Sequence, residues 1–149
     1  MNPRFLVKLS KTPIAAWLRS AHSALYRASG GKIGNKTFGC ETFLLTTTGA
    51  KTGKPRTAPL LYLKDGKHFV IVASNGGSPA HPAWFVNLTK TPEATVQIGR
   101  DAMKVRARQA NAQEKARLWP RLTKFYEGYE VYQSVTKREI PVVILEPVQ

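Results

Sequence analysis

The spacing of hydrophobic residues changes along the chain, and the change separates a helical segment from a strand-rich one. After Pro13, apolar residues recur at the spacing of one helix face until the Gly30-Gly31 pair. This spacing predicts an amphipathic helix, and proline suits its first position because its φ is already helical. The apolar stripe of this helix consists of Ile14, Trp17, Leu18, Ala21 and Leu25.

From Phe43 onward, short apolar runs separated by turn residues predict strands. The six expected strands are Phe43–Thr47, Thr57–Leu63, His68–Ala73, Ala94–Ile98, Ala102–Ala110 and Pro141–Glu146. Two further helices are expected, Ala83–Leu88 after Pro82 and Ala112–Phe125 after the N-cap Asn111, with Glu114 in a capping-box position. This content predicts an α+β, mostly β domain, a small antiparallel barrel with helical decorations.

The length and composition fit one folded unit with a basic extension. The chain has 149 residues, of which 42% are hydrophobic, so a sizeable core is expected. We divide it into residues 1–30, a basic segment with the amphipathic helix, and residues 31–149, the barrel domain. The single cysteine, Cys40, excludes an intrachain disulfide and is typical of a reducing compartment. No metal site is expected, because the three histidines are scattered.

The charge balance predicts an anionic partner. Lys and Arg number 23 against 9 acids, a formal charge of +14, and no acid occurs among the first 40 residues. Such a balance fits nucleic acid, anionic lipid or a polyanionic small molecule, and charge alone does not choose among them.

The N-terminal helix has three interpretations. It packs on the barrel, or it lies on a membrane surface with Trp17 at the interface and Arg19 and Arg27 beside anionic lipid. The third is a cleaved transit peptide, because acid-poor amphipathic segments have that composition too.

A basic turn lies inside the stretch "LLTTTGAKTGKPRTAPLLYL", between two predicted strands. Lys51, Lys54 and Arg56 flank glycines there, with no acid before Asp65. Successive backbone N–H groups in such a turn form a nest for an anion, and the cations add charge-assisted hydrogen bonds. A solvated basic loop is the alternative. The turn is no Walker loop, because it joins two strands and lacks that spacing.

Three other clusters bear polar or aromatic side chains, in "VASNGG", "HPAWFVNL" and "FYEGYEVYQS". Ser74 and Asn75 can bind a heterocycle, and Gly76 and Gly77 would let a flat ring approach the backbone closely. A plain polar loop has the same composition. Tyr126, Tyr129 and Tyr132 share one face if helical, where they line a pocket or form a half-buried stripe. No catalytic triad or carboxylate pair is present, so an enzyme built from these parts needs a cofactor.

The motifs in this order resemble the deazaflavin-dependent nitroreductases of actinobacteria. The similar stretches are "LLTTTGAKTGKPRTAPL", "VIVASNGG", "HPAWFVNL" and "WPRLTKFYEGYEVYQSVTKREIPVVILEP", so the resemblance covers about Pro13 to Pro147. It implies a six-stranded antiparallel split β-barrel related to flavin reductases, with an N-terminal helix and short peripheral helices. It also implies coenzyme F420, a deazaflavin on a ribityl phosphate with a glutamate tail, which is a polyanion.

The resemblance assigns roles to residues of this chain. Lys51, Lys54 and Arg56 would meet the phosphate and the tail. The expected cofactor-binding set is Thr48, Gly49, Ala50, Lys51, Lys54, Arg56, Thr57, Ala58, Pro59, Leu60, Leu61, Val72, Ala73, Ser74, Asn75, Ala83, Trp84, Phe85, Val86, Asn87 and Tyr129. Tyr126 and Tyr132, with Ser74, would shape the substrate site. Many relatives carry lysine where this chain has Asn75, and His81 stands where an amide is common.

The implied activity is hydride transfer from reduced F420 to an electron-poor quinone, activated enone or nitroaromatic. The proton would come from solvent or from Tyr129 or Ser74.

Flavin mononucleotide in the same barrel is the first alternative to F420. A basic nucleic-acid-binding module is the second alternative, and it is less favoured because aromatic and basic residues are not interleaved. We expect no nucleic-acid partner. We expect a cytoplasmic monomer or homodimer, with peripheral contact to the anionic inner face of the membrane through the N-terminal helix.

Overall fold

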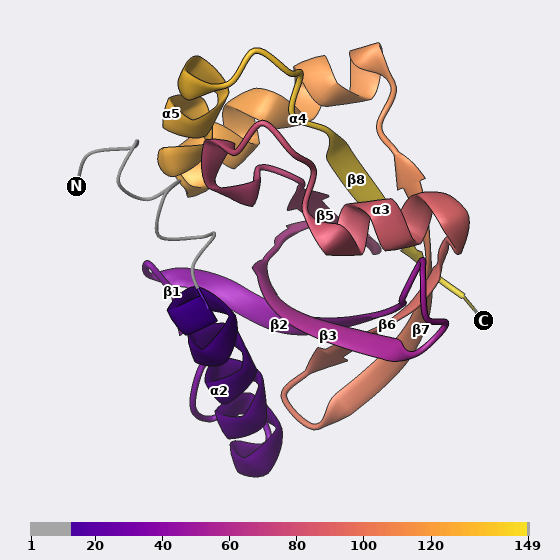
Figure 1. Ribbon diagram of the computed structural model, residues 1–149. Helices are drawn as coiled ribbons and strands as arrows, with labels where there is room; N and C mark the ends of the chain where they lie inside the picture. Colours follow the sequence, from indigo (N-terminus) through magenta and orange to yellow (C-terminus); the bar gives the residue numbers. More distant parts are fainter. Residues whose placement is uncertain (1–12, 149) are drawn as a thin grey trace.

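The computed structural model describes residues 13–148 of the chain (Figure 1), so the basic residues 1–12 of the predicted N-terminal segment lie outside the described part. The helices are α2 (Pro13–Ser29), the short 3-10 turn η1 (Asn75–Gly77), α3 (Ala83–Lys90), α4 (Ala112–Phe125) and α5 (Gly128–Val135). The strands are β1 (Lys36–Thr37), β2 (Cys40–Thr48), β3 (Pro55–Leu61), β4 (Leu63–Asp65), β5 (His68–Val72), β6 (Glu93–Ile98), β7 (Asp101–Gln109) and β8 (Val142–Pro147).

The strands form one antiparallel sheet that curls into a half-barrel. Its order is β1-β2-β6-β7-β8-β5-β4, and β3 pairs with β2 off this path. The described chain has eight strands, so the expected number of six was wrong. The predicted strand Thr57–Leu63 divides at Tyr62, whose backbone N–H donates to the Glu41 carbonyl oxygen at 3.2 Å. Before this point the chain pairs with β2, and after it with β5.

Two hydrophobic cores lie on opposite faces of β5 and β8. Phe69 and Ile71 point into the half-barrel, where Trp84 and Phe85 of α3 join them. Val70 packs on the other face, against Leu118 and Leu122 of α4. Neighbouring side chains of a strand point to opposite faces, so a run that is apolar at every position is buried on both sides. Figure 1 shows α4 and α5 covering the outer face and α3 lying across the barrel opening.

Helix α4 begins where its capping residues predict. The Asn111 side chain accepts the Glu114 backbone N–H at 2.8 Å, and Glu114 Oε1 accepts the Asn111 backbone N–H at 3.1 Å. Both bonds of a capping box are therefore present. The tyrosine-rich segment after α4 forms α5.

Helix α2 packs on the barrel through a residue outside the predicted stripe. Tyr26 is 1% exposed, whereas Trp17, Leu18 and Leu25 are 69%, 53% and 52% exposed. The Tyr26 hydroxyl accepts the Gly99 backbone N–H at 2.9 Å, which ties α2 to the β6–β7 turn. The helix therefore packs on the barrel, as one of its three interpretations has it, but Trp17, Leu18 and Leu25 of the stripe face outward, and of its described members only Ala21 is half-buried. No described helix is both long enough and apolar enough to cross a membrane.

Candidate functional site

One large cavity, of about 900 Å³, extends from the β2–β3 turn to helix α5. Most residues of the expected site line it, and these are Gly49, Ala50, Lys51, Arg56, Thr57, Ala58, Pro59, Leu60, Leu61, Val72, Ser74, Asn75, Ala83, Trp84, Val86, Asn87, Tyr126, Tyr129 and Tyr132. Four of the expected residues are not among the lining residues, namely Thr48, Lys54, Ala73 and Phe85. Ala73 and Phe85 are buried in the core instead, and Thr48 borders a smaller cavity beside β6.

The basic turn uses most of its backbone N–H groups internally. The N–H of Gly49 donates to the Lys54 carbonyl and that of Gly53 to the Gly49 carbonyl, both at 2.8 Å. The Lys54 N–H donates to Thr52 Oγ1 at 3.2 Å. Within the described chain, the N–H groups of Lys51 and Thr52 have no hydrogen-bond acceptor. The predicted nest is therefore limited to these two donors. Of the three cations of the turn, Lys51 and Arg56 line the cavity.

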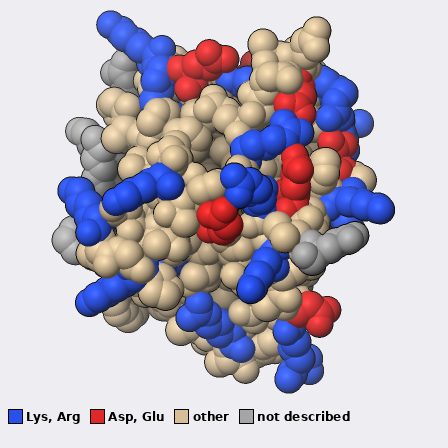
Figure 2. Space-filling model, turned by 90° about the vertical axis from the view of Figure 1, so that its right-hand side faces the viewer, with Lys and Arg blue, Asp and Glu red and all other residues tan. Residues whose placement is uncertain are grey.

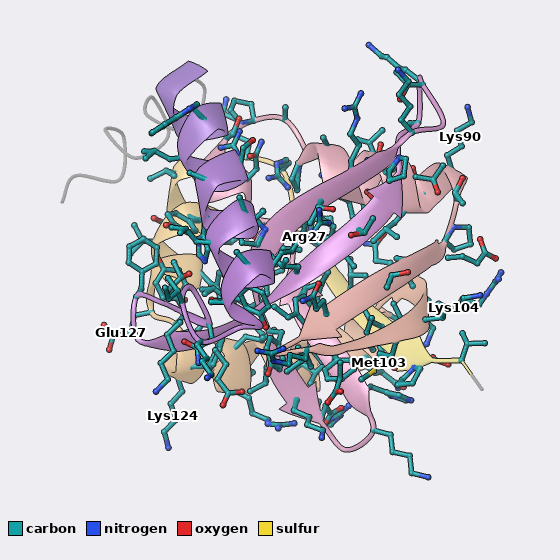
Figure 3. All side chains as sticks on the ribbon, turned by 90° about the horizontal axis from the view of Figure 1, so that it is seen from below. Arg27, Lys90, Met103, Lys104, Lys124 and Glu127 are labelled. Atoms are coloured by element: carbon teal, nitrogen blue, oxygen red, sulfur yellow. The ribbon has the colours of Figure 1, made fainter. Side chains whose placement is uncertain are left out.

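Two residues of helix α3 form hydrogen bonds with this turn. The Asn87 side chain is 6% exposed, and its Oδ1 accepts the Ala50 N–H at 2.9 Å. Its Nδ2 donates to Thr47 Oγ1 at 3.0 Å. Lys90 Nζ donates to the Ala50 carbonyl at 2.7 Å, and Figure 3 shows Lys90 beside the turn. Since both ends of the Asn87 amide are used within the protein, Asn87 positions the turn.

The loop after β5, which lines the cavity through Ser74, Asn75 and Gly76, is held by one guanidinium. Arg138 donates from Nη2 to the carbonyls of Ala73 at 3.1 Å and Ser74 at 2.8 Å, and from Nε to that of Ser78 at 2.9 Å. The loop needs this support because Asn75 has a positive φ of 47°. The Asn75 side chain bonds the Ala80 carbonyl at 3.1 Å, so it stabilises the loop.

The two glycines of this loop have different surroundings. Gly76 lines the cavity, as expected for a backbone that a flat ring approaches closely. Gly77 has a φ of +80°, and a Cβ there would lie 2.6 Å from the Val135 side chain. Gly77 therefore permits the close packing of α5 on the loop.

His81 stands next to Arg138 at the edge of this loop. Its Nδ1 lies 3.3 Å from Arg138 Nη1, and its ring packs on Phe85 with centroids 4.7 Å apart. Loss of hydration, and secondly the charge of Arg138, lower the pKa of His81. A neutral His81 accepts the Arg138 hydrogen bond, whereas a protonated one repels the guanidinium.

Three tyrosines form the far wall of the cavity. The hydroxyls of Tyr126 and Tyr132 lie 2.8 Å apart and bond each other. Burial raises the pKa of Tyr129, which is 4% exposed, so its phenol stays protonated at neutral pH. Among the described residues, the hydroxyls of Tyr129 and Ser74 have no side-chain hydrogen-bond partner, so both are available to a bound molecule.

Sequence reasoning missed several residues of the cavity wall, namely Arg19, His22, Thr37, Phe38, Thr47, Thr52 and Pro82. Thr47 and Thr52 belong to a stretch that the motifs already marked. Arg19 and His22 of α2 carry no local signal, because only the packing of α2 brings them to the cavity. The cavity therefore includes residues from both predicted segments, 1–30 and 31–149.

The positive charge of the described surface is dispersed. Figure 2 shows Lys and Arg around one face with acidic side chains between several of them. Arg106 bonds Glu93 at 2.6 Å, and Arg108 bonds both Glu114, at 2.7 Å, and Glu146. A continuous basic groove, which nucleic-acid binding requires, is therefore not formed on this face.

Known proteins that resemble this chain include F420-dependent reductases. Residues 17–147 match the sequence profile of the F420H(2)-dependent quinone reductases. A quinone reductase of this description from Mycobacterium tuberculosis H37Rv is 40% identical over 136 residues, which cover 89% of this chain and 91% of the relative.

Two solved structures resemble the fold. An F420-H2 dependent reductase, FDR-A, is 39% identical with a TM-score of 0.65, and the match covers 70% of this chain and 93% of that one. A structure described as a domain-swapped dimer is 33% identical with a TM-score of 0.66, covering 89% and 98%. The match to FDR-A confirms the split-barrel type of fold, and the profile and the mycobacterial relative confirm the expected use of F420. The chain belongs to the F420H(2)-dependent quinone reductase family.

Proposed function

We propose that this chain transfers a hydride from reduced coenzyme F420 to a quinone-type acceptor. The observation that carries the proposal is one cavity that reaches from Lys51 and Arg56 of the β2–β3 turn to the hydroxyl-bearing Tyr126, Tyr129 and Tyr132. A coenzyme with a flat ring at one end and an anionic tail at the other fits this distribution. The cations would bind the tail, and the ring would lie towards the tyrosines. The names of the relatives support the same coenzyme and acceptor.

The described residues fit each part of F420. Lys51, Arg56 and the N–H groups of Lys51 and Thr52 would hold the phosphate and the acidic tail. Val72, the Ser74–Gly76 backbone and Trp84 would hold the ring. When bound, reduced F420 supplies the hydride, and the protein supplies binding, orientation and exclusion of water.

The proton for the reduced acceptor would come from a hydroxyl at the tyrosine wall. Tyr129 is placed for this role, because it lines the cavity and its hydroxyl has no side-chain hydrogen-bond partner among the described residues. Burial raises its pKa and makes it a weak acid, so its proton would move only as negative charge develops on the acceptor oxygen. Ser74 is the second donor, since it is buried and lines the same cavity. The bonded pair of Tyr126 and Tyr132 would instead shape the acceptor site.

A cofactor titration followed by turnover tests the proposal. Fluorescence titrations with F420 and with flavin mononucleotide should show tighter binding of F420, and its affinity should fall as salt rises. Reduced F420 should then be oxidised by a quinone only when the protein is present. Equal affinities without a salt effect, or flavin-driven turnover alone, would contradict the assignment of F420.

Nitroaromatics and activated enones are electron-poor in the same way as quinones, so we include them as acceptors of the same site. Parallel turnover assays with one compound of each class, against reduced F420, test this extension. Turnover of the quinone alone would restrict the activity to quinones.

The outward face of α2 supports a peripheral membrane contact. Trp17, Leu18 and Leu25 are exposed apolar residues beside the exposed Arg19. Such a helix face fits the anionic inner surface of a membrane, where a quinone dissolves. We infer a cytoplasmic protein that meets this surface through α2. A homodimer is the assembly that we test first, because one relative is described as a domain-swapped dimer.

A further inference from the structure

A bulky aromatic residue occupies a turn position that disfavours it. Phe38 and Gly39 connect β1 to β2, and their φ values are +52° and +77°. Positive φ at both residues of a two-residue hairpin is the pattern of a type I′ turn, where Asn, Asp and Gly predominate. A phenylalanine there is an outlier, because its Cβ meets the backbone in the left-handed region.

The Phe38 side chain does little for the core. It is 69% exposed and belongs to neither hydrophobic core cluster. A Cβ added at the neighbouring Gly39 would meet no atom within 4 Å, so the turn stands clear of its surroundings. Core packing therefore does not explain why an aromatic residue is kept at a strained position.

The ring nevertheless forms part of the cavity wall. Phe38 lines the cavity and stacks on Tyr126, with ring centroids 5.6 Å apart and planes 10° from parallel. Tyr126 in turn meets the Tyr129 ring edge to face at 4.9 Å. The rings of Tyr129, Tyr126 and Phe38 thus form a continuous aromatic series. Tyr129 at one end is the candidate proton donor, and Phe38 at the other end is exposed to solvent.

We propose that Phe38 is a specificity-determining residue, whose ring covers one face of a flat acceptor and favours fused-ring quinones over single-ring ones. The inference rests on the proposed function, because it concerns the acceptor end of the same cavity. A fused acceptor has the area to contact both Tyr126 and Phe38, whereas a single ring gains little beyond Tyr126. The strained turn holds the aromatic ring at the cavity mouth at some cost in stability.

The test compares Phe38→Asn with the wild-type protein, using naphthoquinone and benzoquinone as acceptors. Asparagine removes the ring and suits a positive φ. We expect KM for naphthoquinone to rise roughly 3- to 10-fold, the effect of losing one aromatic contact. KM for benzoquinone should change less than about 2-fold, the F420 affinity should stay the same, and Tm should not fall. Ile33→Asn is the matched control, because Ile33 is 55% exposed and is not among the residues lining the cavity.

A lower Tm with equal KM changes for both quinones would show a structural role and overturn the inference, as would unchanged KM values. Titration of oxidised naphthoquinone against tryptophan fluorescence gives a second readout that needs no turnover. Weaker naphthoquinone binding by Phe38→Asn supports the inference, and equal binding overturns it. If the wild-type protein does not turn over quinones, the proposed function is refuted. The role of Phe38 is still decided in that case, because the binding measurement needs no turnover.

Discussion

The buried side chain of Asn87 accepts the backbone N–H of Ala50, 37 positions earlier in the chain, at 2.9 Å. This bond fixes the basic turn to α3. Lys51 and Thr52 of the turn line the cavity, and within the described chain their N–H groups have no acceptor. The site for the anionic end of the coenzyme therefore depends on a residue that already has both of its hydrogen-bonding groups occupied within the protein.

Asn87→Ala should weaken both folding and F420 binding. The Ala50 N–H and the Thr47 hydroxyl lose their partner, which costs about 1–3 kcal/mol in the free energy of unfolding. The turn then shifts, so F420 should bind more weakly by calorimetry. Thr89→Ala on the exposed side of α3 is the control and should change neither quantity. Unchanged F420 affinity in a destabilised Asn87→Ala protein would show that the turn is held without this bond.

Arg56→Ala should cost more F420 affinity than Lys51→Ala. Arg56 is the second residue of β3, and its planar guanidinium can form paired bonds with a phosphate, worth about 1.5–3 kcal/mol. Lys51 lies in the turn before β3 and offers a single ammonium; both side chains are exposed, so solvent screens both charges and the paired geometry makes the difference. Calorimetry at two salt concentrations measures both losses, with Lys67→Ala as a distant control. A larger loss for Lys51→Ala would reverse the order of the two anchors.

Arg138→Lys should impair turnover more than stability. One ammonium cannot reproduce the three carbonyl contacts of the guanidinium, so the loop carrying Ser74 would move and kcat should fall. Lys137→Gln, the exposed neighbour, should leave kcat unchanged. Wild-type kcat in the Arg138→Lys protein would show that the loop is held by other contacts.

The contact between Arg138 and His81 predicts that kcat depends on pH. The lowered pKa means that the folded state favours neutral His81, so the loop contact is complete above the ordinary value of about 6.5. It weakens as pH falls below that value, because protonated His81 repels Arg138. The pH profile of kcat should therefore decline on the acid side, and His81→Asn should flatten that decline. An identical profile in both proteins would exclude His81 as the cause.

Asp65 should contribute to stability at neutral pH and lose its contribution in acid. Hydrogen bonds from Arg117 and Arg121 lower the pKa of Asp65 to about 2. The stabilisation is complete above the ordinary pKa of about 4 and is lost as pH falls towards 2. Asp65→Asn should cost about 1 kcal/mol at pH 7, because solvent screens the pair, and this cost should shrink steadily as pH falls from about 4 through about 2. Urea melts at several pH values measure this, with Asp101→Asn as control.

The two sides of α2 should respond differently to mutation. Trp17→Ala with Leu18→Ala should reduce sedimentation with anionic liposomes and leave Tm unchanged, because both side chains are exposed. Tyr26→Phe should lower stability by about 1 kcal/mol, since the Gly99 N–H loses its acceptor, and leave liposome binding intact. Equal liposome binding by the double variant would remove the support for a membrane contact.

Local sequence signals determined much of the barrel and part of the site. The Asn111 cap places the start of α4 because both partners of the capping box lie within four residues. The apolar runs of β5 and β8 were recognisable because burial on both faces leaves no polar alternation. The ordered motifs identified the F420 chemistry, and the basic turn was visible because its charges are contiguous.

Tertiary structure alone decided which of these residues face the cavity and which support it. The outward stripe of α2, the division of the predicted strand at Tyr62 and the position of Phe38 all depend on pairing between distant segments. Arg138 is 64 positions from Ser74, whose carbonyl it binds, and no periodicity reports such a contact. Local patterns record what each residue prefers in its own helix or strand. The support of a binding site instead depends on which polar groups the folded chain brings within hydrogen-bond distance.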